Sequence, residues 1–219
     1  MNRNRIRRMS CQAIKLLAPL LLLAACTSLP EPKGVSPNIY MLEAGPAIPA
    51  AQVKRDLVLS ISVPRALPGF DTPQMAYVQQ PYELSYFVTS RWADTPAHML
   101  EPLIAQAMQQ TQSFRAVERT AGTIPADVRL VVELVRLQQD FTASPSRVRL
   151  TLRAQLIDVR GRRLLATQQF DEYENATSEN AYGGVTSANR LVQRVLVKLA
   201  AFCVNASALE SPSSMQDTK

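Results

Sequence analysis

The residue with the clearest chemical role is Cys26, which closes an N-terminal segment typical of exported proteins. Residues 1–15 carry five basic side chains and no acidic one, and residues 16–23 are mostly leucine. An apolar run of about ten residues is too short to cross a ~30 Å hydrocarbon core as a helix and matches a removable signal peptide. Because a cysteine stands where such a signal normally ends in alanine, we expect residues 1–25 to be removed and the Cys26 sulfur to carry lipid.

The segment Leu23, Ala24, Ala25 and Cys26 resembles the lipobox of bacterial lipoproteins. The resemblance implies that a dedicated peptidase recognises the small residues and cuts before Cys26, after a diacylglycerol has been added to the sulfur. Three acyl chains, at about 0.8 kcal/mol per buried methylene, make such attachment effectively permanent. The alternatives are an ordinary signal peptide cleaved nearby, or an uncleaved N-terminal anchor, with Cys26 incidental in both.

Loss of residues 1–25 changes what charge and cysteine content imply. The formal charge of +6 falls to +1, because five basic residues and no acidic ones are lost. This near-neutral balance argues against a nucleic-acid partner. Cys203 is then the one cysteine left besides Cys26, so no intrachain disulfide is expected, and its apolar helical surroundings favour a buried, inert thiol over a reactive or intermolecular one.

The residues needed for catalysis or for a bound metal are missing from the sequence. The single histidine, His98, has no second histidine or cysteine pair with which to bind a metal. A triad of His98, Asp94 and a serine would need a nucleophile-elbow motif, and no phosphate-binding loop with a lysine is present. We therefore expect neither enzyme activity nor a cofactor.

The chain predicts one folded domain at residues 38–205, between a Pro-rich tether at residues 26–37 and a polar, disordered tail at residues 206–219. The tether could hold the domain up to about 35 to 40 Å from a membrane. Strands are expected at residues 39–42, 57–63, 75–78, 84–88, 128–138, 147–158 and 163–173. Short connections make the last three consecutive antiparallel hairpins.

Helices are expected at residues 95–110 and 187–204, the second after Gly183 and Gly184. Asp94 or Thr95 would cap the first helix, and Pro102 predicts that this helix either begins late or kinks. The fold class is therefore α+β, with two main helices covering one face of a mixed, largely antiparallel sheet.

Two groups of side chains are candidate partner or lipid contacts. The aromatic residues concentrate within sixteen positions and would form either a docking surface or ordinary core: Tyr77, Tyr86, Phe87 and Trp92. An arginine row on one strand would bind headgroups or an acidic partner, or be a solvated face: Arg147, Arg149 and Arg153. An uncovered sheet face would also favour a homo-oligomer.

Several segments occur in the order found in a known family: residues 38–42 (NIYML), 70–77 (FDTPQMAY), 91–96 (RWADTP) and 158–161 (DVRG), between the lipobox and a C-terminal helix. The chain resembles the ABC-type transport auxiliary lipoproteins of the PqiC type over nearly its whole mature length. The resemblance implies a fold similar to anticodon-binding and TolB N-terminal domains.

The resemblance also implies an outer-membrane lipoprotein, facing the periplasm, that docks the MCE-domain conduit of an intermembrane lipid transport system with an inner-membrane permease and ATPase. Thr27 and Ser28 lack the aspartate that retains lipoproteins at the inner membrane, which agrees with this location. The alternatives are an assembly lipoprotein of another outer-membrane complex, or a periplasmic lipid carrier with an interior apolar cavity.

Overall fold

The computed structural model describes residues 36–43, 48–51, 53–119 and 125–210. The described residues from Pro37 to Glu210 belong to one compact unit. The predicted signal peptide, Cys26, most of the predicted tether and residues 211–219 lie outside the described residues. No helix among the described residues is long and apolar enough to cross a membrane.

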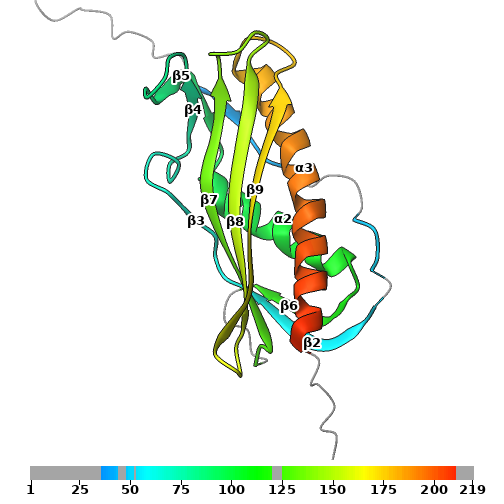
Figure 1. Ribbon diagram of the computed structural model, residues 1–219. Helices are drawn as coiled ribbons and strands as arrows, with labels where there is room; N and C mark the ends of the chain where they lie inside the picture. The colour runs from blue at the N-terminus through cyan, green and yellow to red at the C-terminus, as the bar shows by residue number, and fades with distance from the viewer. Residues whose placement is uncertain (1–35, 44–47, 52, 120–124, 211–219) are drawn as a thin grey trace, which may run out of the picture. The chain divides into compact units, whose positions relative to one another are not determined.

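Three long antiparallel strands, referred to below as the central strands, form the largest part of the sheet, and the last of them is an edge strand (Figure 1). They are β7 (Val128–Asp140), β8 (Arg147–Asp158) and β9 (Arg163–Asn175), paired as consecutive hairpins. The alternation along β8 sets its faces, since Val148, Leu150, Leu152, Ala154 and Leu156 are all buried. The predicted hairpins are confirmed, and β7 and β9 each run two residues past their predicted ends.

The other edge of β7 pairs with three strands in succession, all parallel to it: β2 (Arg55–Ile61), β3 (Arg65–Ala66) and β4 (Gln74–Val78). Three further strands complete the sheet: β6 (Phe114–Arg119) beside β2, β5 (Ser85–Trp92) antiparallel to β4, and β1 (Asn38–Tyr40) parallel to β5. The mixed sheet is confirmed, with the longest ladders antiparallel. The sequence did not predict β3 or β6.

Helix α2 spans Pro96–Gln110. Thr95 caps it as predicted, because its side-chain oxygen accepts a hydrogen bond from the His98 backbone N–H (3.4 Å). The helix is continuous through Pro102, so the predicted late start is wrong. Burial of the apolar stripe around Leu100 and Ile104 compensates for the backbone hydrogen bond that proline cannot donate.

Helix α3 spans Ala181–Ala206, and a 3-10 turn follows at Ser207–Glu210. The predicted start at residue 187 is wrong, because Gly183 and Gly184 lie in the first turn of the helix. Asn180 caps this turn by accepting a hydrogen bond from the Gly183 backbone N–H (2.9 Å). The two glycines permit close packing: a Cβ would lie 2.2 Å from the Ser178 carbonyl oxygen at residue 183 and 2.3 Å from Gln139 Oε1 at residue 184.

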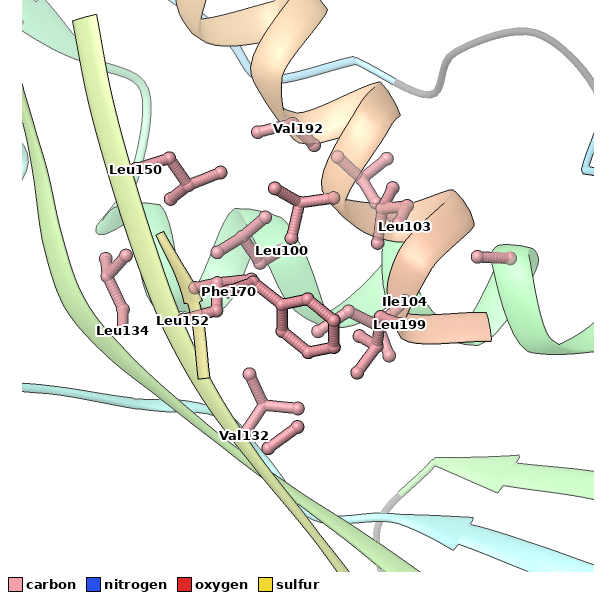
Figure 2. Close-up of a cluster of buried hydrophobic side chains, with 14 of the residues drawn as sticks. Leu100, Leu103, Ile104, Val132, Leu134, Leu150, Leu152, Phe170, Val192 and Leu199 are labelled. Atoms are coloured by element: carbon pink, nitrogen blue, oxygen red, sulfur yellow. The ribbon is translucent and has the colours of Figure 1, made fainter. Parts of the chain in front are cut away.

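Both helices pack on the same face of the sheet, as the core close-up shows (Figure 2). Side chains of α2 and α3 meet those of the central strands in one cluster that includes Leu100, Ile104, Leu134, Leu152, Phe170 and Leu199. Neither helix lies on the opposite face of β7, β8 and β9. We call this surface the open face.

One end of the sheet is formed by residues 78–85, 141–146 and 176–182, and we call it the hairpin end. There the Phe141 backbone N–H donates to the Val78 carbonyl oxygen (2.8 Å), which joins the β4–β5 and β7–β8 connections. The Ala176 backbone N–H donates to the Ser146 carbonyl oxygen (2.7 Å), which brings the start of α3 to the same end.

Candidate interaction surface

The predicted lipidation site lies outside the described residues. Cys26 and the residues that precede it, Leu23, Ala24 and Ala25, therefore remain a prediction from sequence. The described residues allow a test of where the predicted aromatic and arginine contacts lie.

Two of the four predicted aromatic residues belong to one cluster near the hairpin end. The rings of Tyr77 and Phe87 lie 4.7 Å apart, centroid to centroid. Phe141 joins them from the β7–β8 connection, at 6.0 Å from Tyr77 and 6.3 Å from Phe87, with edge-on geometry. All three rings are half-buried. Phe141 was not predicted as part of this cluster, because it is 54 positions from Phe87 and only the strand pairing brings the two residues together.

The other two aromatic residues are tied into the fold. Trp92 is only 4% exposed and belongs to the core. The Tyr86 hydroxyl donates a hydrogen bond to the Gly69 carbonyl oxygen (2.9 Å), which fixes the loop before β4. The four residues therefore do not form one continuous surface.

The predicted arginine row lies on the open face, and Arg149 has the most extensive pairing. Its Nε and Nη2 atoms donate to the two carboxylate oxygens of Asp171 on β9, at 2.9 and 2.6 Å. The Thr151 hydroxyl donates to the same carboxylate (2.8 Å). The hydrogen bond from Arg149 is the main reason that the pKa of Asp171 falls to about 2, and the same contact raises the pKa of Arg149.

The neighbouring arginines are paired as well. Arg153 donates to Glu133 on β7 (3.0 Å), and Arg147 lies 3.5 Å from Asp140. The guanidinium carbons of Arg147 and Arg149 lie 4.6 and 4.9 Å from the ring centroid of Tyr173. Burial acts to raise the pKa of Asp140, but hydrogen bonds from Thr142 and the charge of Arg147 lower it overall.

These pairings determine the net charge of the arginine row on the open face. Each of the three arginines lies beside a carboxylate of a neighbouring strand. Each positive charge of the row is therefore matched by a carboxylate.

Three hollows border the folded body. One of about 380 Å³ lies where the open face meets the β4–β5 turn, between Tyr82, Leu84, Arg136 and Arg149. A second, of about 670 Å³, is lined by residues that include Arg65, His98, Arg129 and Ile157. A third, of about 410 Å³, lies on the helix side beside Val53, Val197 and Val204. All three are open to solvent and mix apolar with polar groups.

A hollow bounded by core residues is too small for a lipid. That space, between Met75, Phe87, Leu137 and Ala188, measures about 10 Å³. It holds about one water molecule, whereas small-molecule sites need several hundred cubic ångströms. This hollow therefore gives no support to a carrier that encloses an acyl chain.

The described histidine and cysteine do not lie together in one site. His98 lies 3.4 Å from Asp94 on the exposed first turn of α2. Within the part of the chain that the structure describes, no group of three or more His, Cys, Asp and Glu side chains could hold a metal ion. Cys203 is a free, fully buried thiol, and burial raises its pKa, so the prediction of a buried thiol is confirmed.

Comparison with known proteins gives one family and several structural relatives. The family model described as "ABC-type transport auxiliary lipoprotein component" matches residues 40–200. The crystal structure of protein XCC0632 from Xanthomonas campestris, of family DUF330, has 20% identity and a TM-score of 0.74, and the match covers 80% of this chain and 99% of that one. No curated protein matches the sequence.

A second solved structure shares the fold at lower identity. The hypothetical protein CT253 from Chlamydia trachomatis has 9% identity and a TM-score of 0.52, with 71% of this chain and 99% of that one covered. At these identities the structural likenesses show the fold alone.

Proposed function

The chain belongs to the ABC-type transport auxiliary lipoprotein component family, and from this premise we propose that it is the outer-membrane subunit of an MCE-type intermembrane lipid transport system. The acyl chains on Cys26 would hold it in the bilayer, with the folded domain in the periplasm. Its protein partners would be an MCE-domain conduit and the inner-membrane permease and ATPase. The observation that carries the proposal is the family match at residues 40–200, preceded by the lipobox-like residues 23–26.

The proposed role is binding, not catalysis. The histidine and the described cysteine lack the partners that acid–base or nucleophilic chemistry requires: His98 faces one carboxylate in solvent, and Cys203 is buried. Energy for transport would come from the ATPase. The domain would supply a binding surface for the conduit at the membrane in which it is anchored.

The open face is the surface we assign to the conduit. Both helices cover the other side of the sheet, so they leave the open face accessible to a partner. Its ion pairs are partly exposed, as for Arg153 and Glu133, whose side chains are 48% and 32% exposed. Exposed pairs of this kind contribute little to folding and serve to select a partner with matching charges.

Affinity purification of the full chain from native membranes tests the proposal. Co-purification of an MCE-domain protein with the permease is the expected result. Recovery of components of an unrelated outer-membrane complex, or of tightly bound lipid without any transporter subunit, would contradict it. A Cys26→Ser variant is the matched control, because it should fold normally but lack the acyl chains that attach the protein to the membrane.

Membrane fractionation tests the location separately. The mature protein is expected in the outer-membrane fraction, because residues 27 and 28 are threonine and serine. Recovery with inner membranes alone would reject outer-membrane placement while leaving the lipid anchor intact.

A further inference from the structure

Tyr82 occupies an unusual position at the tip of the β4–β5 connection. It is the third residue of a tight turn that starts at Gln80, with Pro81 second and the Glu83 backbone N–H 3.4 Å from the Gln80 carbonyl oxygen. Its φ is +69°, a value that turns of this kind normally assign to glycine or asparagine. The side chain is fully exposed, at 108% of its reference area. The fold thus accepts backbone strain and gains no packing from the ring, which points to a role outside the folded domain.

Two further exposed side chains lie at the hairpin end or close to it, since Tyr182 belongs to residues 176–182 and Val88 is three residues past residue 85. Tyr182, in the first turn of α3, is 63% exposed, and Val88, on β5, is 93% exposed. The Ser187 hydroxyl holds the start of α3 at this end by donating to the Asn175 carbonyl oxygen (2.8 Å).

The chain also enters the domain here. The ring of Tyr40, in the first strand, lies 6.3 Å from the ring of Tyr182, centroid to centroid. The eleven residues at 27–37 separate Cys26 from the first strand, which begins at Asn38, and span at most about 40 Å when fully extended. A bilayer that holds the acyl chains of Cys26 is therefore within reach of the hairpin end.

We infer that Tyr82, Val88 and Tyr182 contact the phospholipid bilayer in which Cys26 is anchored. Tyrosine has an apolar ring and a polar hydroxyl, so it is stable at the headgroup layer, where one end of the side chain is in hydrocarbon and the other in water. Val88 adds exposed apolar area on β5. This contact would orient the domain with its hairpin end on the membrane, and it rests on the proposed lipid anchor.

Fluorescence of the lipidated mature protein in vesicles tests the inference. Tyr82→Trp places a reporter in the turn, and the native Trp92 is buried and serves as an internal reference. Leu164→Trp is the matched control: Leu164 is 55% exposed and lies opposite Ile157, at the other end of the central strands. The vesicles contain phosphatidylethanolamine and phosphatidylglycerol, with or without brominated acyl chains.

The expected result for the Tyr82→Trp protein is a shift of the reporter emission to shorter wavelength on reconstitution and a loss of its intensity with brominated lipid. The Leu164→Trp protein should show neither change. Equal signals from the two variants would overturn the inference. A shifted emission of the Tyr82→Trp protein that brominated lipid does not quench would overturn it too, and would indicate a protein contact.

Vesicle flotation separates this outcome from failure of the anchor. If the lipidated protein floats with the vesicles but shows no quenching at residue 82, the proposed anchor stands and the inferred orientation is wrong. A lipidated protein that does not float contradicts both.

Discussion

Arg149 and Asp171 form a two-pronged ion pair across β8 and β9, with N–O distances of 2.9 and 2.6 Å. The two residues are close neighbours on the open face, because Arg149 lies opposite Tyr173 and Asp171 lies two residues away on the same strand. The guanidinium also lies over the Tyr173 ring. This arrangement supports the local register of the hairpin and neutralises the charge of Arg149.

Replacement of Asp171 by asparagine should lower the free energy of unfolding at neutral pH by about 1 kcal/mol, since the charged hydrogen bonds are partly exposed. The folded-state pKa of Asp171, about 2, lies below the ordinary 3.8, so the ionised carboxylate stabilises the fold. That contribution is complete above pH 3.8 and is lost as the pH falls toward 2. Urea unfolding of wild type and variant across this range measures the difference.

The matched control is Asp71→Asn, which changes an exposed carboxylate in the loop before β4. It should leave the unfolding free energy within about 0.5 kcal/mol of wild type. An Asp171→Asn effect that persists unchanged at pH 2 would show that the ion pair is not its cause.

Exchange of the charges between Glu133 and Arg153 should separate folding from docking. The double variant Glu133→Arg with Arg153→Glu keeps a cross-strand pair, so its stability should stay within about 0.5 kcal/mol of wild type. The reversed charge pattern should reduce co-purification of the conduit. The same exchange between Glu172 and Lys198, a pair between β9 and α3, is the control. Equal recovery of the conduit with both double variants would show that this part of the open face does not bind the conduit.

Glycine at position 82 should stabilise the fold. A left-handed backbone costs a residue with a Cβ roughly 1–2 kcal/mol, which glycine avoids, although its greater freedom in the unfolded chain offsets about 0.5–1 kcal/mol of that gain. Tyr82→Ala removes the ring but keeps the strain, so it should not gain stability. Thermal unfolding measures the stability of both variants. A Tyr82→Gly protein less stable than the Tyr82→Ala protein would show that the backbone at this turn is not strained.

Alanine at position 183 should destabilise the protein, although helix propensity alone favours alanine over glycine by about 1 kcal/mol. Its Cβ would lie 2.2 Å from the backbone oxygen of Ser178, and overpacking of this kind typically costs about 1–3 kcal/mol. Gly184→Ala should cost less, because the atom it meets belongs to the side chain of Gln139 and can move. Chemical denaturation compares the two, and a Gly183→Ala protein more stable than wild type would contradict the packing.

The sequence predicted the elements whose pattern is local. Alternation along residues 147–158 identified β8 and its buried face, and helical spacing identified both helices. Strand β6 was not predicted, because its partly buried residues show no clear alternation. Its parallel pairing with β2 also joins segments that are far apart in the sequence. The start of α3 was misplaced because Gly183 and Gly184 were interpreted as a break, whereas the tertiary contacts of this turn require small residues.

The candidate surface was predictable in part. The arginine row was located on the correct face, but its pairing with Glu133 and Asp171 depends on the register of three strands and cannot be derived from spacing along one of them. Tyr82 was not singled out, because neither its positive φ nor its full exposure follows from residue type. A tyrosine after proline in a turn is the one signal that could have drawn attention to it.

The proposed function depends on a lipid at Cys26 that holds the domain at a membrane. Intact-mass and peptide mass spectrometry of the protein purified from native membranes tests it most directly. We expect a mature chain that begins at Cys26, with a diacylglyceryl group on the sulfur and a further acyl chain on the new N-terminus. A free thiol at Cys26, or a mature chain that begins at another residue, would contradict it.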